Sequence, residues 1–244
     1  MSADDLELAG LVPLSGVDWP DHLVATVFTQ GCPWACGYCQ NVELIDPRIP
    51  GQVPWERVRD LLGRRRGLLD GVVFSGGEAT RQPALLPAVR EVHAAGLGVG
   101  LHTAGAYPDR LAAVLPHLEF LGLDVKAMPE DYPVVVGRGG SGRRAWRSLE
   151  LALAARRARP LELEVRLTVH PGGAGADRAV ELARRLDSLG VPVLALQEAR
   201  ARGTTEEFGA ALGGASAVVG PGWFDRLTAE VRSAWPGELR VRPA

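Results

Sequence analysis

The chain has 244 residues, of which 46% are hydrophobic and 23% charged, as expected for a globular protein with a sizeable core. Its formal net charge of −2 excludes a strong general attraction to nucleic acid or to an anionic membrane surface. The chain has no apolar run of the ~20 residues that a membrane helix needs and no signal peptide, and its three cysteines suggest no disulfide, so we expect a cytoplasmic protein.

Strand and helix patterns alternate along most of the chain. Residues 8–30 predict a short leading strand, a turn at 16–21 and a strand at 23–29 that is rich in β-branched and aromatic residues. Further strands are expected at residues 71–75, 97–102, 118–124, 161–169 and 191–197. Helices are expected at residues 54–66, 82–95, 107–115, 142–159 and 176–189.

This alternation predicts an α/β fold with a mainly parallel sheet and right-handed crossovers. Six strands are counted from residue 23, fewer than the eight of a closed barrel, so we expect an open partial (β/α)6 barrel. No linker divides the chain, which predicts one domain over residues 1–244 with its core at about 10–197.

The pattern weakens in the extension at residues 198–244. Thr204 to Glu207 are suited to capping a short helix. Residues 222–235 predict an amphipathic helix whose apolar stripe is Phe224, Leu227, Val231 and Trp235. We expect this stripe to pack in the core, on the sheet or the barrel floor, and a partner-docking helix is the alternative.

All three cysteines, Cys32, Cys36 and Cys39, lie in one C-x3-C-x2-C segment directly after the strand at 23–29. Parallel α/β folds present catalytic groups at this end of their strands. Closely spaced thiolates on one loop can hold an iron–sulfur cluster. A four-iron cluster normally takes four thiolates, so three would leave one iron open to an outside ligand. A structural zinc site would need a fourth ligand and usually paired C-x2-C knuckles.

Two further segments follow strands of the predicted sheet. Gly76-Gly77-Glu78 is either a plain turn or a place where a ligand approaches the backbone closely. Asp124 and Lys126, two residues apart on a strand, point to the same face and are either a charge pair at a loop mouth or part of a site.

The cysteine spacing, with Tyr38 just before the last cysteine, resembles the radical S-adenosylmethionine (SAM) superfamily. The wider run over residues 18–41 resembles the glycyl-radical-enzyme activating proteins, and most of all those of anaerobic ribonucleoside-triphosphate reductase. The resemblance implies a [4Fe-4S] cluster on the three cysteines, with SAM chelating the open iron. It also implies reductive cleavage of SAM to a 5′-deoxyadenosyl radical.

The same resemblance implies a set of SAM-pocket residues. Gly76, Gly77 and Glu78 correspond to a motif that binds the methionine amino group, with Glu78 supplying or supporting an acceptor. Arg166 is the candidate for the SAM carboxylate or ribose. The other implied pocket residues are Tyr38, His102, Thr103, Asp124, Lys126 and, near the adenosine, Gln197.

His102-Thr103 stands where pyruvate formate-lyase activators carry Asp-Thr. Their aspartate helps to hold a monovalent cation, so His102 puts that cation in doubt. We expect no acid or base residue outside the cluster ligands.

These features predict an activating enzyme that generates a glycyl radical on a partner enzyme and takes its electron from an external flavodoxin or ferredoxin. The first alternative is a small-molecule radical SAM enzyme, such as a 7-carboxy-7-deazaguanine synthase-like protein. The second is a non-catalytic iron–sulfur or redox module that uses the cysteine loop alone.

Overall fold

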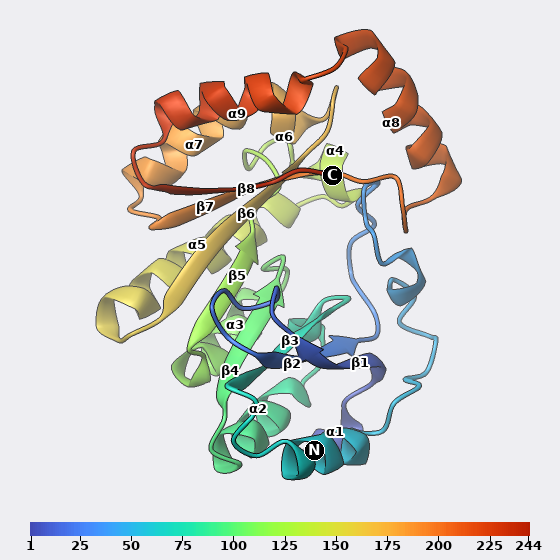
Figure 1. Cartoon of the computed structure of the whole chain (residues 1–244), viewed down its shortest axis with the longest axis vertical. Helices are drawn as coiled ribbons and strands as arrows, with labels where there is room; N and C mark the ends of the chain where they lie inside the picture. The colour runs from blue at the N-terminus through green and yellow to red at the C-terminus, as the bar shows by residue number, and fades with distance from the viewer.

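Eight strands form one sheet in which each strand pairs with the next along the chain (Figure 1). The computed structural model describes all residues 1–244. Strand β1 is antiparallel to β2, and every later pair is parallel. The strands are β1 (Leu8–Ser15), β2 (Val24–Thr29), β3 (Gly71–Gly76), β4 (Gly98–Thr103), β5 (Phe120–Asp124), β6 (Glu162–Val169), β7 (Val193–Glu198) and β8 (Glu238–Arg242).

The sheet is an open partial barrel, because the edge strands β1 and β8 do not pair with each other. This confirms the expected α/β fold and its parallel order. The expected end of the sheet at residue 197 is wrong, because β8 continues it beside β7. Only two residues of β8, Leu239 and Val241, are apolar, and they alternate with charged residues, so this short edge strand lacks the apolar run of β3.

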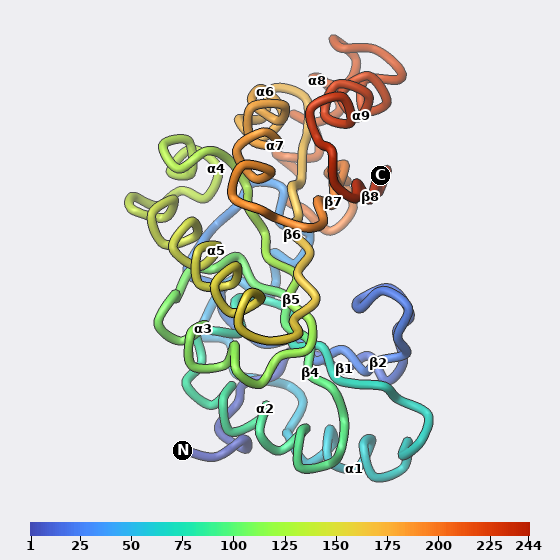
Figure 2. Tube along the Cα trace, turned by 90° about the vertical axis from the view of Figure 1, so that its left-hand side faces the viewer, coloured from blue at the N-terminus to red at the C-terminus, as the bar shows by residue number.

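Helices cover the outer face of the sheet, and Figure 2 shows α2, α3, α5 and α7 gathered on one side of the strands. The α-helices are α1 (Trp55–Arg64), α2 (Leu85–Ala94), α3 (Pro108–Val114), α4 (Tyr132–Val136), α5 (Ser141–Ala158), α6 (Ala174–Asp177), α7 (Ala179–Ser188), α8 (Glu206–Val219) and α9 (Trp223–Ala234). None of the helices combines the length and the apolar character needed to cross a membrane.

Two helices differ from the expected pattern. The helix expected at residues 176–189 is two helices, α6 and α7, which break at Arg178. The Arg178 guanidinium donates hydrogen bonds to Glu130, Asp131 and Glu181, and these contacts fix the break. The short helix α4 was not expected, and it ends at Gly137 in the left-handed conformation that glycine adopts without strain.

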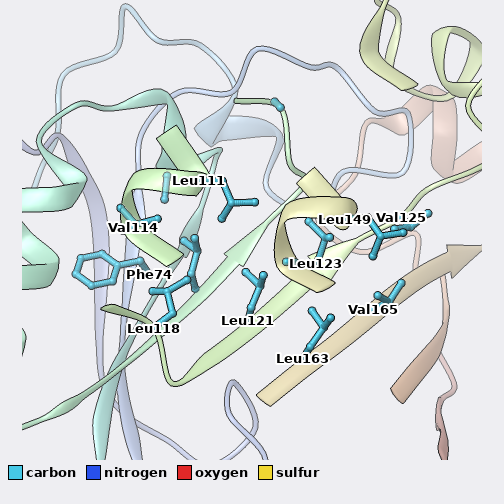
Figure 3. Close-up of a cluster of buried hydrophobic side chains, with 14 of the residues drawn as sticks. Phe74, Leu111, Val114, Leu118, Leu121, Leu123, Val125, Leu149, Leu163 and Val165 are labelled. Atoms are coloured by element: carbon cyan, nitrogen blue, oxygen red, sulfur yellow. The ribbon is translucent and has the colours of Figure 1, made fainter. Parts of the chain in front are cut away.

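The main core lies between the sheet and its helices (Figure 3). Phe74 of β3, Leu121 and Leu123 of β5 and Val165 of β6 are fully buried. Leu111 of α3 and Leu149 of α5 pack against them (Figure 3). Because β3, β5 and β6 are anchored by this layer, the loops at their carboxyl ends start from fixed positions.

The extension beyond residue 198 packs in two different ways. In α9 and just after it, Phe224, Val231 and Trp235 are buried in the core, and Leu227 packs against it partly buried. Helix α8 is longer than the short helix expected there, and it buries none of its residues. Thr205 caps α8 by accepting a hydrogen bond from the Phe208 N–H at 3.2 Å.

Candidate functional site

A cavity of about 370 Å³ lies at the carboxyl ends of the parallel strands. All the residues expected to form the site, except Glu78, line it. They are Cys32, Cys36, Tyr38, Cys39, Gly76, Gly77, His102, Thr103, Asp124, Lys126, Arg166 and Gln197. The fold therefore gathers residues from the cysteine loop and from five strands around one space.

The cysteine loop begins directly after β2 and is tied to the segment that follows it. The Gly31 and Cys32 N–H groups donate hydrogen bonds to the carbonyls of Leu44 and Ile45, at 2.8 and 3.0 Å. A tight turn brings Cys39 back toward Cys36, with 3.0 Å between the Cys39 nitrogen and the Cys36 oxygen. These backbone bonds fix the loop at the mouth of the cavity.

The three thiols lie within electrostatic reach of one another. Burial, followed by the nearby Glu78 carboxylate, raises the pKa of the Cys32 thiol to about 12. Burial also raises the pKa of Cys36, and Cys39 adds to that shift. Thiolates at Cys32 and Cys36 are therefore disfavoured unless a cationic metal centre stabilises them.

The donor set of this loop fits an iron–sulfur cluster with one open iron, because three thiols on one loop line one cavity. The thiols are not already gathered into a coordination sphere, since no three His, Cys, Asp or Glu side chains lie close enough to hold a metal ion.

Gly76 and Gly77 bring the end of β3 against the cysteine loop. Gly76 has φ of +101°, and a Cβ on it would lie 2.5 Å from the Thr29 nitrogen. A Cβ on Gly77 would lie 2.5 Å from the Gly31 oxygen. Larger residues would push β3 away from the loop, so both glycines are required by close backbone approach.

Glu78 is buried behind the cavity wall, with 1% of its surface exposed. Its Oε1 accepts hydrogen bonds from the Thr80 N–H at 3.1 Å, the Thr80 hydroxyl at 2.6 Å and the Thr103 hydroxyl at 2.6 Å. Its Oε2 accepts one from the Ala104 N–H at 3.0 Å. Of the two roles expected for Glu78, supplying or supporting an acceptor, this geometry corresponds to support, because the carboxylate ties the loop after β3 to the loop after β4.

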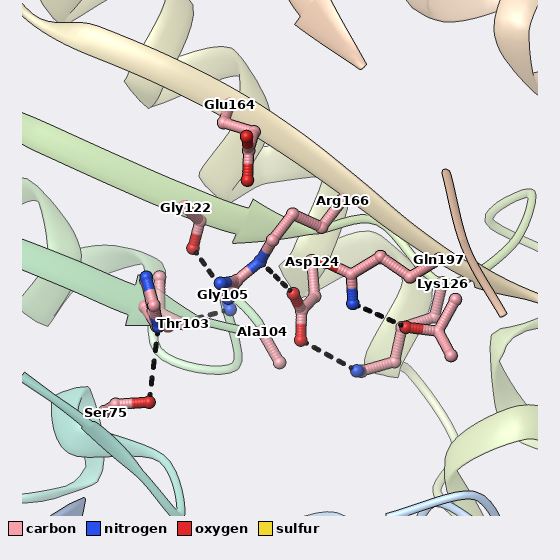
Figure 4. Close-up of polar contacts among 12 residues, drawn as sticks. Ser75, Thr103, Ala104, Gly105, Gly122, Asp124, Lys126, Glu164, Arg166 and Gln197 are labelled. Carbon is pink, nitrogen blue, oxygen red and sulfur yellow. Dashed lines mark hydrogen bonds and ion pairs between the residues drawn. The ribbon is translucent and has the colours of Figure 1, made fainter. Parts of the chain in front are cut away.

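Asp124 lies between two cationic side chains (Figure 4). Its Oδ1 accepts from Arg166 Nε at 2.9 Å, and its Oδ2 from Lys126 Nζ at 3.1 Å. Burial opposes ionisation of Asp124, but Lys126 and Arg166 together hold its pKa below the usual range. The carboxylate thus stays charged and fixes both cations at the cavity wall.

His102 is a neutral imidazole in this environment. Burial, reinforced by the Arg166 charge, lowers the pKa of His102 to about 3. Its Nε2 lies 2.7 Å from the Asp18 carbonyl oxygen, which can only accept, so Nε2 carries the proton. Its Nδ1 lies 3.4 Å from the Ser75 hydroxyl. Gly122 makes room for it, since a Cβ there would lie 2.9 Å from His102 Cδ2 and 3.1 Å from Arg166 Cζ.

Tyr38 belongs to the cysteine loop and lines the cavity from that side. Lys126 Nζ lies 5.4 Å from the centre of its ring, within the range of a cation–π contact. The Tyr38 hydroxyl is buried and has no hydrogen-bond partner. Gln197, which also lines the cavity, donates to the Thr168 hydroxyl at 3.5 Å.

The cavity also contains residues that were not expected in it. Arg200 and Arg242 line it together with Thr168 and Glu198. Arg242 belongs to β8 and lies in register with Gln197 of β7. The signal that would have found it is the two-residue alternation of charged and apolar side chains at residues 238–242.

One curated relative, a protein of Methanocaldococcus jannaschii named "Putative glycyl-radical enzyme activating enzyme", is 28% identical to this chain over 128 residues. The match covers 51% of this chain and 52% of that protein, so the chain spans about half the length of this relative.

Solved structures share the fold. Streptococcus suis SuiB bound to S-adenosylmethionine has a TM-score of 0.57 and 14% identity, with 88% of this chain and 48% of SuiB covered. The methyltransferase TsrM of Kitasatospora setae, with cobalamin and a [4Fe-4S] cluster bound, has a TM-score of 0.53 and 17% identity, with 71% and 36% covered.

The chain matches the Radical SAM superfamily over residues 26–178, which is more than half of its length and includes the cysteine loop. Enzymes of this family use a [4Fe-4S] cluster and S-adenosylmethionine. By this match, and with the partial barrel and the three-cysteine cavity in place, the chain belongs to the Radical SAM superfamily.

Proposed function

We propose that this radical SAM enzyme activates a glycyl radical enzyme, one that resembles anaerobic ribonucleoside-triphosphate reductase. The observation that carries the proposal is the similarity to the Methanocaldococcus jannaschii protein, whose name describes activation of a glycyl radical enzyme. The reductase-like partner rests on the sequence resemblance over residues 18–41. When bound, the cluster and SAM supply a 5′-deoxyadenosyl radical that can take a hydrogen atom from a glycine Cα.

The side chains of the cavity bind and position in this function. Cys32, Cys36 and Cys39 would hold the cluster. Asp124 fixes the Arg166 guanidinium, whose remaining N–H groups can bind the SAM carboxylate or ribose. No acid or base is required, which agrees with a neutral His102 whose ring nitrogens are both in contact with protein oxygens.

Two features favour a polypeptide substrate and an external electron donor. The sheet is open between β1 and β8, so a chain segment can enter from the side without passing through a closed ring of strands. All three cysteines lie in the loop that would hold the first cluster, so this chain has no thiols for a second one. A flavodoxin or ferredoxin would therefore bring the electron.

The test is electron paramagnetic resonance of a partner enzyme whose glycine is deuterated at Cα. Anaerobically reconstituted protein, SAM and reductant are mixed with the anaerobic ribonucleotide reductase of the same source. We expect a glycine-centred signal that is a singlet with the deuterated partner and a doublet with the unlabelled one, together with deuterium in the 5′-deoxyadenosine, and none of these with Cys36→Ala. Formation of 5′-deoxyadenosine without deuterium and without a glycyl signal would refute the proposed partner.

A further inference from the structure

Two arginines in the cavity wall are outside the set expected for SAM. Arg242 lies at the end of β8, and Arg200 lies two residues beyond β7. Both line the same cavity as the cysteine loop. They therefore add cationic groups to the wall formed by the last two strands of the sheet.

Arg242 is held in place by two acceptors on the neighbouring strands. Its Nη1 donates to Gln197 Oε1 at 2.7 Å, and its Nη2 donates to Glu164 Oε2 at 2.9 Å. Glu164 is itself buried, with 1% of its surface exposed, and it also accepts from Arg240. A guanidinium has five N–H donors, so three remain for a ligand after these two bonds. Because the side chain is already ordered, little conformational entropy is lost when a ligand binds.

Arg200 has no carboxylate partner in the structure. Its only hydrogen bond is from Nη2 to the Pro243 carbonyl at 3.3 Å. By contrast, the cavity's other two cations, Lys126 and Arg166, both contact the Asp124 carboxylate. Arg242 likewise contacts the Glu164 carboxylate, so among the four cations that line the cavity Arg200 is the one without a carboxylate contact.

One carboxylate, Glu198, also belongs to this wall, and it accepts a hydrogen bond from the Ala244 N–H at 3.1 Å. Counted with Glu164, which Arg242 contacts, the four cations and three carboxylates of the cavity leave a formal surplus of one positive charge. That surplus suits a singly charged anion better than a doubly charged phosphate, because Glu198 would repel the second charge. A planar carboxylate also matches the fork of a guanidinium.

We infer that Arg200 and Arg242 form a subsite for a carboxylate group of the substrate that reacts beside SAM. The carboxylate can belong to an aspartate or glutamate side chain near the reacting residue of a polypeptide, or to a free organic acid. The subsite does not depend on the partner being a glycyl radical enzyme, because any carboxylate-bearing substrate of this cavity would use it.

The test is calorimetry on anaerobically reconstituted protein saturated with SAM. The probes are acetyl-Asp-Gly-amide, its neutral isostere acetyl-Asn-Gly-amide, and butyrate as a singly charged free acid. We expect the unmodified protein to bind the aspartate peptide about tenfold or more tightly than the asparagine peptide, the discrimination given by one charge-assisted contact. Equal affinity for the two peptides, or no binding of any acidic probe, would overturn the inference.

The variants are Arg200→Gln and Arg242→Gln, with Arg202→Gln as the matched control, because Arg202 is exposed on the same loop and does not line the cavity. The ratio of the two peptide affinities should fall toward one in the first two variants and stay unchanged in the control. Should Arg242→Gln not fold, Arg242→Lys serves instead and should retain only part of the ratio, because lysine lacks the planar fork.

Two outcomes separate the sources of the carboxylate, and both support the subsite. Tighter binding of the aspartate peptide than of butyrate identifies a polypeptide side chain, and the reverse order identifies a free acid. A ratio that is unchanged in both cavity variants refutes the subsite. The glycyl-radical assay is independent of these measurements, so failure of the subsite and failure of the proposed partner are distinguishable.

Discussion

Glu78→Gln distinguishes a residue that supports the SAM pocket from one that contacts SAM. In the structure, Oε1 accepts three hydrogen bonds from Thr80 and Thr103, and Oε2 accepts one from the Ala104 N–H. A glutamine can keep its carbonyl oxygen in the first position. Its NH2 group would then face the Ala104 N–H, leaving two buried donors against each other.

The expected loss of stability follows from these contacts. A buried donor without an acceptor costs about 1–3 kcal/mol, and weakening three bonds from a charged to a neutral acceptor adds to that cost. We expect the free energy of unfolding of the cluster-free protein to fall by about 2–4 kcal/mol. The SAM affinity should fall as well, because the loop at Thr103 and Ala104 is part of the cavity wall.

Denaturant unfolding under reducing, anaerobic conditions measures the stability, and equilibrium dialysis of the reconstituted protein measures the SAM affinity. Glu56→Gln is the control, because Glu56 is exposed on α1, and its effect should stay within about 0.5 kcal/mol. If Glu78→Gln weakened SAM binding while its unfolding free energy matched that of the control, the carboxylate would be a direct ligand and the supporting role would be wrong.

Three further predictions concern the cavity. Cys36→Ala should lose the four-iron cluster and all 5′-deoxyadenosine formation; iron content equal to that of the parent protein would contradict the assignment of the cluster ligands. Arg166→Ala should weaken SAM binding roughly tenfold to a hundredfold with the iron content retained, and unchanged affinity by dialysis would show that Arg166 is not a SAM ligand. Because the pKa of His102 is lowered to about 3 in the folded state, only the unfolded imidazole takes up a proton as the pH falls below about 6.5. The contribution of His102 to stability is therefore present above that pH and is lost on acidification, at about 1.4 kcal/mol per pH unit. Between pH 6 and 4 the unfolding free energy of His102→Gln should accordingly fall less steeply than that of the parent protein. Equal slopes for the two proteins would mean that His102 is not a buried neutral group.

The sequence predicted the parts of the fold that have strong local patterns. Strands β2 and β3 are runs of apolar residues that are buried on both faces, and such runs are recognisable without their neighbours. Strand β8 is different, because three of its five residues are charged. Its charged side chains face groups such as Glu164, and that compensation comes from a residue more than seventy positions earlier in the chain.

The sequence predicted which residues line the cavity where it also predicted the strands that carry them. Strand periodicity predicted that Asp124 and Lys126 share a face; β5 ends at Asp124, but the structure still brings the two charges to 3.1 Å. The burial of Glu78 was not predictable, because its partners Thr103 and Ala104 lie on the next strand and loop, about 25 residues away. The local sequence around a carboxylate that follows two glycines does not indicate whether this carboxylate faces a ligand or a neighbouring loop.

The charge balance around Asp124 bears on the monovalent cation that His102 had put in doubt. Arg166 occupies Oδ1 and Lys126 occupies Oδ2, so each carboxylate oxygen already contacts a cation that the chain itself supplies. The His102 ring adds no negative charge, and its Nδ1, the one nitrogen with a lone pair, faces the Ser75 hydroxyl. A sodium or potassium ion at Asp124 would have to approach two fixed positive groups and displace one of them. Lys126 and Arg166 thus place two positive charges at Asp124, and because both belong to the chain itself, this charge is part of the cavity wall.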